Sequence, residues 1–239
     1  MGHAAKFLIV FLLFCPNAHA NTRDGLFGWW KFDESSGNAV DSSGRGNTGT
    51  PTGTTIVTNC PRSGCRSFNG TSDLVSLGNI FDAPTVYTFS AWIYAKSLGG
   101  GSAARILDKS NGGATGYYFK ILSVSNLAVF HVGAAGDQVS TGTITLNAWQ
   151  YVAVTWSGTQ LIFYINAVSA GTIAFATALA SNATALVIGN RVDAARGFDG
   201  SIDDVRIYNR VLSAQEIKDL YSAGIKLGTG QIGQARMNF

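Results

Sequence analysis

Oxygen-bearing side chains are concentrated in residues 33–47, a segment otherwise rich in glycine and serine. Asp33, Asp41 and Asn47 offer carboxylate or amide oxygens, and the residues between them offer flexible backbone carbonyls. Calcium in proteins takes about six to eight such oxygen ligands. The segment is therefore a candidate calcium-binding loop. The alternative is a turn-rich loop whose carboxylates accept hydrogen bonds from backbone amides.

Two further polar loops are candidates for binding a saccharide. Asn111 and Tyr117 belong to the first, and Arg191, Asp193 and Arg196 belong to the second. A sugar site needs hydrogen-bonding groups of this kind beside an exposed aromatic face. For each loop the alternative is a solvated connection, and for each aromatic residue it is packing in the core. The aromatic candidates are Trp92, Tyr117, Tyr118, Trp149 and Trp156.

Residues for covalent or acid–base catalysis are scarce beyond the first 20 positions. The only glutamates there are Glu34 and Glu216, whereas glycosidases use two closely set carboxylates. His131 is the only histidine in the same region, and it has neither a nearby acid nor a Gly-x-Ser-x-Gly motif to complete a triad. The sequence therefore favours a protein that is not an enzyme.

Short β-strands are the elements expected to position these side chains. Residues 149–156 and 161–165 are rich in β-branched and aromatic residues and flank a short turn, which predicts a hairpin. Both faces of this hairpin are apolar, so we expect it in the middle of a packed β structure. The regular spacing of strands and turns favours an all-β fold, a two-sheet antiparallel sandwich or jelly roll. Other strands are predicted at 26–33, 66–69, 74–77, 86–95, 106–109, 117–122, 127–132, 143–146, 185–188 and 202–208.

One short helix is predicted near the C-terminal end. Ser213 and Glu216 have the spacing of a capping box, in which each side chain binds the other residue's backbone amide. Leu212 and Ile217 occupy the positions of a hydrophobic staple. Gly224 is the expected C-terminal stop. Glu216 is thus explained by structure rather than by catalysis.

The first 20 residues have the organisation of a secretory signal peptide. Lys6 precedes the apolar run 7–14, and Ala18-His19-Ala20 supplies an A-x-A cleavage site. The apolar run is shorter than the roughly 20 residues that span a bilayer. We therefore predict cleavage after Ala20 and a secreted protein without a membrane span, with one domain at 21–224. The tail 225–239 is predicted to be extended or disordered, and a homo-oligomer formed through it by strand addition is a further hypothesis.

Two cysteines remain after residue 20, Cys60 and Cys65, and in an exported chain this close spacing favours a disulfide. The formal net charge of the whole chain is +3, and removal of Lys6 lowers it to +2. The charges are scattered along the sequence rather than grouped. The sequence therefore shows no patch suited to nucleic acid.

The order of motifs resembles that of laminin-G-like, concanavalin A-like domains. The resemblance begins with GWWKFDE at 28–34 and DSSGRGN at 41–47, continues with WQYVAVT at 149–155, and ends with FDGSIDDVRIY at 198–208. It covers roughly residues 25–224. One departure is that Asn166 is followed by Ala167, where the family usually has glycine.

This resemblance implies a two-sheet jelly roll, frequently with calcium, used in extracellular carbohydrate or protein recognition. Related glucanases bind a structural calcium through an aspartate at the position of Asp203, so Asp203 and the adjacent Asp204 join the calcium candidates. Ion pairing of these acids with Arg206 or Arg210 is the alternative. We therefore expect a secreted, non-catalytic module, outside the cell or on its surface, that binds a glycan or a surface protein. A self-assembling or adhesive surface protein is the second interpretation.

Overall fold

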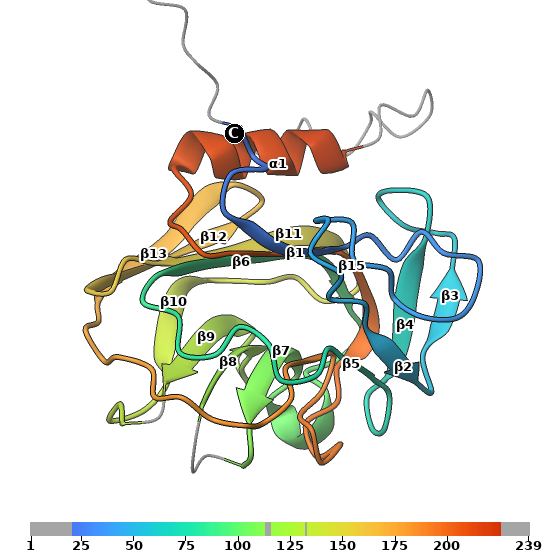
Figure 1. Ribbon diagram of the computed structural model, residues 1–239, viewed down its shortest axis with the longest axis horizontal. Coiled ribbons are helices and arrows are strands. Elements are labelled where there is room, and N and C mark those ends of the chain that lie inside the picture. The colour runs from blue at the N-terminus through green and yellow to red at the C-terminus, as the bar shows by residue number, and fades with distance from the viewer. Residues whose placement is uncertain (1–20, 113–115, 132, 226–239) are drawn as a thin grey trace, which may run out of the picture.

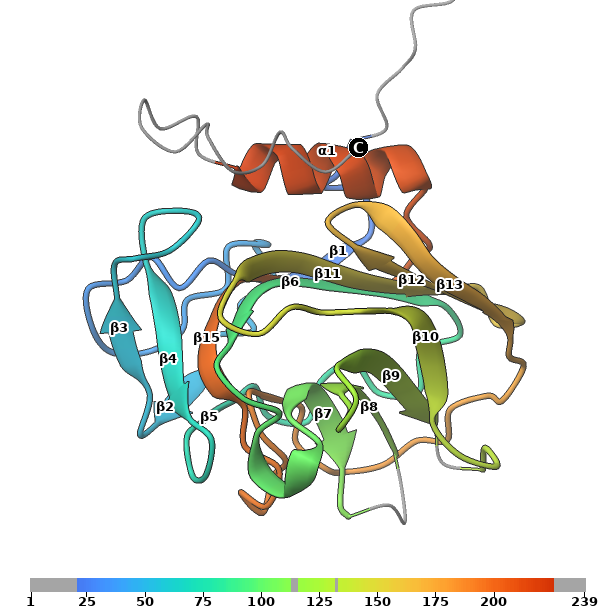
Figure 2. The ribbon, with the colours of Figure 1, turned by 180° about the vertical axis from the view of Figure 1, so that it is seen from behind.

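Two antiparallel β-sheets and one short helix form the part of the protein described by a computed structural model, residues 21–112, 116–131 and 133–225 (Figure 1). The sheets pack face to face, and the helix lies on the outer side of one of them, as the view from behind also shows (Figure 2). The predicted all-β, two-sheet sandwich with one C-terminal helix is confirmed. The predicted signal peptide and nearly all of the predicted tail lie outside the described residues.

The eight-stranded sheet has the order β13-β12-β11-β6-β15-β4-β3, with β1 also paired to β15. Its strands are β1 (Leu26–Trp30), β3 (Thr55–Val57), β4 (Cys65–Asn69), β6 (Tyr87–Ala95), β11 (Trp149–Trp156), β12 (Gln160–Ile165), β13 (Val168–Ala174) and β15 (Asp199–Tyr208).

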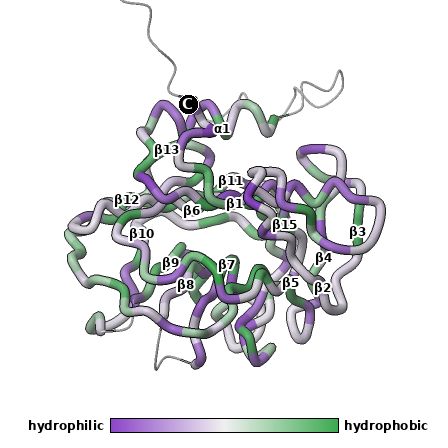
Figure 3. The backbone as a smooth tube through the Cα atoms, viewed as in Figure 1, coloured by the Kyte–Doolittle hydropathy of each residue, from purple (hydrophilic) through white to green (hydrophobic). Residues whose placement is uncertain are grey.

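The seven-stranded sheet has the order β10-β9-β8-β7-β14-β5-β2. Its strands are β2 (Thr50–Thr52), β5 (Leu74–Ser76), β7 (Arg105–Ser110), β8 (Gly116–Ile121), β9 (Asn126–His131), β10 (Gln138–Thr143) and β14 (Val187–Ile188). A short 3-10 helix, η1 (Gly100–Ser102), precedes β7. Hydrophobic residues are concentrated along the strands, for example in β7 and β9 (Figure 3). Residues of both strands belong to the core between the sheets.

The predicted central hairpin is confirmed as β11 and β12, and both of its faces are buried. Val152 and Val154 point into the core between the sheets. Tyr151 and Ala153 point the other way, into a second hydrophobic cluster beneath helix α1 (Ala214–Gly224). The apolar outer face of the hairpin is therefore explained by the helix that covers it.

The N-terminal end of α1 forms as predicted. The Ser213 side chain accepts a hydrogen bond from the Glu216 amide, and the Glu216 side chain accepts one from the Ser213 amide. The other end differs, because the chain leaves the helix through Ile225 in extended conformation, without a left-handed stop at Gly224. Glycine is required there by packing, since a Cβ on Gly224 would lie 2.1 Å from Nε1 of Trp92.

The predicted strand at 143–146 is wrong. The observed strand β10 ends at Thr143, and the backbone amides that follow bind groups outside any ladder. The Ile144 amide donates to the Ser125 carbonyl and the Thr145 amide to the Gln150 side chain. Strands β2, β3 and β13, and all of β10 before Thr143, were not predicted, because their partly exposed sequences lack a strong apolar pattern.

Two local features bear on the sequence-based expectations. Cys60 and Cys65 form the predicted disulfide, with their Cα atoms 5.9 Å apart. At the β12–β13 turn, Asn166 and Ala167 both have positive φ, 50° and 63°. A two-residue hairpin of this kind favours glycine at such positions, so the alanine is held in an unfavourable conformation.

Candidate functional site

The outer face of the seven-stranded sheet carries a row of aromatic and charged side chains. Asp108, Tyr118 and Phe130 are paired across β7, β8 and β9, so they project from the same face of the sheet. Tyr118 and Phe130 are half-buried, and their rings stack at 5.1 Å with an interplanar angle of 16°. This row gives the face a partly exposed aromatic surface.

Charged groups surround the Tyr118 ring. The Arg105 guanidinium lies 3.5 Å from the ring centroid and the Lys120 ammonium 4.8 Å from it. Asp137 accepts a hydrogen bond from the Tyr118 hydroxyl at 3.1 Å and pairs with Lys120 at 2.8 Å. Burial, followed by the negative charge of Asp137, raises the pKa of Tyr118 to about 12. The hydroxyl therefore stays protonated at neutral pH.

Asp108 is a buried acid within this row. Its Oδ2 lies 2.6 Å from Nε of Arg105, and its Oδ1 accepts hydrogen bonds from the amide and hydroxyl of Ser110. Burial raises the pKa of Asp108 to about 6, although Arg105 and Ser110 act in the opposite direction. Among the described residues, the buried Nη1 of Arg105 has no hydrogen-bond partner. The pair is thus only partly satisfied by the protein.

The loop at 190–198 lies beside this row and is fixed by Asn190. The Asn190 side chain accepts hydrogen bonds from the amides of Arg191 and Arg196, and it donates to the carbonyls of Thr71 and Asp73. This clamp ties the loop to the turn at 70–72. Between the two segments is a pocket of about 330 Å³, walled by glycine, alanine and short polar residues.

Arg191 and Asp193 form a bidentate ion pair at the tip of the same loop, with nitrogen–oxygen distances of 2.7 and 2.6 Å. The hydrogen bonds between them raise the pKa of Arg191 and lower that of Asp193. The negative charge of Asp108 also raises the pKa of Arg191.

Four of the five residues predicted to bind a ligand lie on or beside this surface. Arg191, Asp193 and Arg196 belong to the loop, and exposed Asn111 precedes Gly112, where a Cβ would lie 3.7 Å from Nη1 of Arg191. The fifth, Tyr117, does not lie on this surface. It is 1% exposed in the core, and its hydroxyl donates a hydrogen bond to the Phe81 carbonyl.

The aromatic residue that does face outward is the next one along the strand. Alternation on a strand shows that Tyr117 and Tyr118 point to opposite faces, but it does not identify the buried face. Phe130, Arg105 and Lys120 were missed for the same reason, and Asp137 was missed because it lies in the loop before β10. Of the other aromatic candidates, Trp92 and Trp156 are buried, whereas Trp149 is half-buried on the other sheet.

The structure separates the calcium candidates into two groups. In the first, Asp41 accepts four hydrogen bonds, from the amides of Trp29, Ser43 and Asn47 and from the Ser43 hydroxyl. These bonds lower its pKa although burial opposes them. The Asn47 side chain donates to the Phe27 carbonyl. Both residues therefore serve to hold a turn together.

Asp203 forms the second group with its acidic neighbours. It is fully buried, and no side chain among the described residues donates a hydrogen bond to its carboxylate, although the backbone amides of Asp204 and Arg62 do. Burial, then the charges of Asp204 and Asp33, raise its pKa to about 8. Asp204 instead pairs with Arg206 and Arg62. Within the described residues, no cluster of three or more histidine, cysteine, aspartate or glutamate side chains has the arrangement of a metal site.

The few residues that are chemically suited to catalysis occupy structural positions. His131 is fully buried; it contacts the Tyr87 hydroxyl through Nε2 at 2.9 Å and the Thr177 carbonyl through Nδ1 at 2.8 Å. Burial lowers the pKa of His131 to about 4, so it is neutral at physiological pH. Glu216 is engaged by the helix cap and by Arg210. In the described part of the chain, no helix is long and apolar enough to cross a bilayer.

A two-sheet antiparallel sandwich of this kind is consistent with a jelly roll. The chain belongs to the concanavalin A-like lectin/glucanases superfamily, because the laminin G-like model of that superfamily matches residues 69–218. The family expected from the sequence motifs is thereby confirmed. A search of curated proteins gave no match.

Solved structures with the same fold include carbohydrate-associated domains. Domain 4 of AbnA, a GH43 extracellular arabinanase from Geobacillus stearothermophilus solved in complex with arabinotriose, has a TM-score of 0.65 and 19% identity over 82% of this chain and 98% of its own. The binding domain of Paraclostridial mosquitocidal protein 1 has a TM-score of 0.64 and 18% identity over 84% of this chain.

A third similar structure comes from botulinum neurotoxin type C, whose cell entry depends on interaction with two ganglioside molecules; its TM-score is 0.61 at 14% identity over 84% of this chain. This chain covers 52% of the mosquitocidal-protein chain and 52% of the neurotoxin chain, about half of each. At these identities the similarities establish the fold alone.

Proposed function

We propose that this protein is a secreted, non-catalytic glycan-recognition module that binds its ligand on the outer face of the seven-stranded sheet. The observation that carries this proposal is the half-exposed Tyr118–Phe130 pair, bordered by Arg105, Lys120 and the loop of Arg191. Aromatic faces pack against the apolar faces of sugar rings, and the surrounding charged groups can bind hydroxyls.

The structural relatives support the choice of a glycan as the ligand. One was solved with arabinotriose, and the cell entry of another depends on gangliosides. The positions of the residues best suited to catalysis support a non-catalytic role, since His131 is a neutral core residue and Glu216 caps a helix. An extracellular location fits both the disulfide and the family.

A binding screen with a single substitution tests this proposal. The purified protein is screened on an array of oligosaccharides that includes arabino-oligosaccharides and ganglioside headgroups, and hits are measured by calorimetry. Tyr118→Ala is expected to weaken binding at least tenfold, the scale of a lost aromatic anchor. Tyr94→Ala removes a half-buried tyrosine from the eight-stranded sheet and serves as the control. Equal affinities of the two variants would rule out this face as the site.

We further propose a structural calcium ion at Asp203, with Asp33 as a second ligand. The support is the chemistry of the donor: the Asp203 carboxylate is buried without a side-chain hydrogen-bond partner among the described residues, and the negative charge of Asp33 acts on it. Calcium favours carboxylate oxygens of this kind. Asp41 does not fit, because both of its carboxylate oxygens already accept hydrogen bonds within the protein.

Thermal unfolding with calcium and with a chelator tests the ion. Binding to the folded state alone stabilises by about 2.7 kcal/mol at a hundredfold excess over the dissociation constant. A rise in Tm in wild type, absent in Asp203→Asn, is the expected result, and an equal response of both proteins would contradict it. Size-exclusion chromatography of the same samples tests the second interpretation, a self-assembling surface protein, which requires a stable oligomer.

A further inference from the structure

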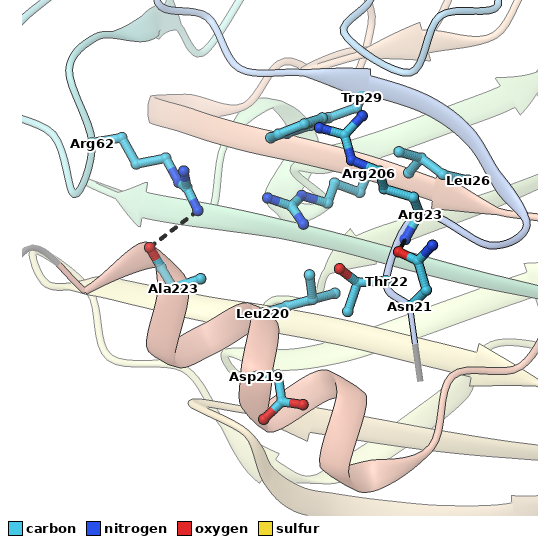
Figure 4. A pocket seen from close by; sticks show the side chains of 10 residues that line it. All are labelled: Asn21, Thr22, Arg23, Leu26, Trp29, Arg62, Arg206, Asp219, Leu220 and Ala223. Atoms are coloured by element: carbon cyan, nitrogen blue, oxygen red, sulfur yellow. Dashed lines mark hydrogen bonds between the residues drawn. The ribbon is translucent and has the colours of Figure 1, made fainter. Parts of the chain in front are cut away.

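A second pocket lies on the opposite side of the molecule, between α1 and the outer face of the eight-stranded sheet (Figure 4). Its volume is about 510 Å³. Leu26 and Leu220 supply apolar wall, and Trp29 closes one side. The residues around it come from the start of the described chain, from β1, β15 and α1, and from the loop that contains the disulfide.

Three arginines from three separate segments converge on this pocket: Arg23, Arg62 and Arg206 (Figure 4). Arg206 is only 6% exposed and binds Asp204 at 3.1 Å. Arg62 approaches the same carboxylate at 3.2 Å. One aspartate therefore serves two guanidinium groups.

Cations also outnumber anions when the whole lining is considered. Asp219 on α1 is the one acidic side chain among the described residues that line the pocket. Even with Asp204 counted behind the wall, three arginines face two carboxylates. Lys31 adds another positive charge nearby, 4.5 Å from the Trp29 ring, whose other cationic neighbour is Arg206 at 4.3 Å. The local potential in this partly enclosed space is therefore positive.

Buried neighbours fix the position of Arg206. Ser90 is paired in register with Arg206, and the Tyr208 side chain contacts its guanidinium. Together with Asp204 they hold this guanidinium beside the pocket.

We infer that this pocket binds a compact oxyanion, a carboxylate or a sulfate group. Arginine is suited to both groups, because its planar donors match two oxygens at once. Partial enclosure strengthens such bonds relative to those at an open surface. The site goes beyond the proposed glycan site, since it lies on the other sheet and shares no residue with the Tyr118 surface. An acidic sugar and a free inorganic anion both carry such an oxyanion group.

Calorimetric titration at constant ionic strength tests the inference with three probes: sodium sulfate, glucuronic acid and uncharged glucose. Arg23→Gln is the main variant, because Arg23 is exposed and its removal leaves the packing intact. Lys218→Gln is the matched control, an identical loss of charge at an exposed position of α1 that does not line the pocket. Arg206→Lys is the second variant, which keeps the buried charge but removes bidentate geometry.

Saturable binding of sulfate or glucuronate is expected in wild type and in Lys218→Gln, with affinity lowered about two- to fivefold in Arg23→Gln, the range for an exposed ionic contact. Tighter binding of glucuronate than of sulfate would identify an acidic sugar, and the reverse a free anion. The inference would be overturned if neither anion bound at a concentration of about 10 mM, at which even a weak site is substantially occupied. Equal affinity in all variants would overturn it as well.

Discussion

The two outer faces of the sandwich are covered in different ways. On the eight-stranded sheet, α1 buries Ile217 and Leu220 against aromatic residues of the strands, which include Trp92 and Tyr151. On the seven-stranded sheet, the corresponding layer holds charged side chains and the half-exposed pair Tyr118 and Phe130. The sheets share one core, yet one outer face is largely apolar and covered by a helix, with the arginine-lined pocket beside it, and the other is polar and open.

This difference separates stability from recognition. An apolar face excluded from water contributes folding free energy in proportion to its buried area. A face of partly exposed aromatic and charged groups contributes less to folding, but it presents groups that a polar ligand can bind. Substitutions of the apolar residues under α1 and of residues on the Tyr118 surface should therefore have opposite profiles, with large effects on stability for the first group and on glycan binding for the second.

The largest expected effect is on the covered face. Ile217→Ala removes a fully buried side chain and should lower the free energy of unfolding by about 2–5 kcal/mol, through lost burial and a residual cavity. Glycan affinity, measured well below the unfolding transition, should stay within about twofold of wild type. Denaturant titration provides the stability, and a loss of affinity in the folded variant would contradict the separation.

Strand β9 sharpens the comparison, because its successive residues Phe130 and His131 point to opposite sides. The folded-state pKa of His131 is lowered to about 4, below the roughly 6.5 of an unfolded histidine, so the unfolded state binds more protons between these values. Stability should fall as pH drops from about 6.5 to 4, by about 1.4 kcal/mol per unit from this residue.

The measurement is the pH dependence of unfolding in wild type and in His131→Gln. Asp108, whose pKa is raised to about 6, contributes a trend of the opposite sign, but it does so in both proteins and cancels in their difference. The wild type should lose more stability on acidification than the variant. Parallel curves would show that His131 gains its proton without penalty.

A smaller effect on stability is expected from Phe130 itself. Phe130→Ala truncates a half-buried ring and should cost about 1 kcal/mol, well below the loss for a fully buried aromatic residue. Binding of the glycan identified by the array should weaken about tenfold, because the stacked surface with Tyr118 is lost. A variant that unfolds readily but binds normally would reverse the roles assigned to the two faces.

The smallest expected effect lies at the edge of the eight-stranded sheet. Ala167→Gly should raise the free energy of unfolding by about 0.5–1 kcal/mol, because glycine adopts the observed φ of 63° without steric cost. Thermal unfolding measures the gain. Ala174→Gly, at the end of the same strand β13, is the control and should not stabilise, since Ala174 lacks a positive φ.

Much of the fold follows from local patterns in the sequence. The β11–β12 hairpin, the capping box of Ser213 and Glu216, and the Cys60–Cys65 disulfide each depend on residues close together in the chain, and each formed as predicted. The strand predicted at 143–146 failed because its amides bind a side chain and a distant loop. Local propensity does not contain those partners.

The candidate sites depend on contacts that only the tertiary structure makes. Alternation on β8 required Tyr117 and Tyr118 to face opposite ways, but the packing of two sheets decided that Tyr117 is buried. The candidate calcium ligands Asp41 and Asp203 were both plausible in sequence, yet a side-chain hydroxyl and three backbone amides bind Asp41, whereas no side chain among the described residues hydrogen-bonds Asp203. Arg23, Arg62 and Arg206 are far apart in sequence and meet only where the helix covers the sheet. Burial and long-range proximity are properties of the folded chain. A sequence pattern predicts a contact reliably only when both partners are close together in the chain.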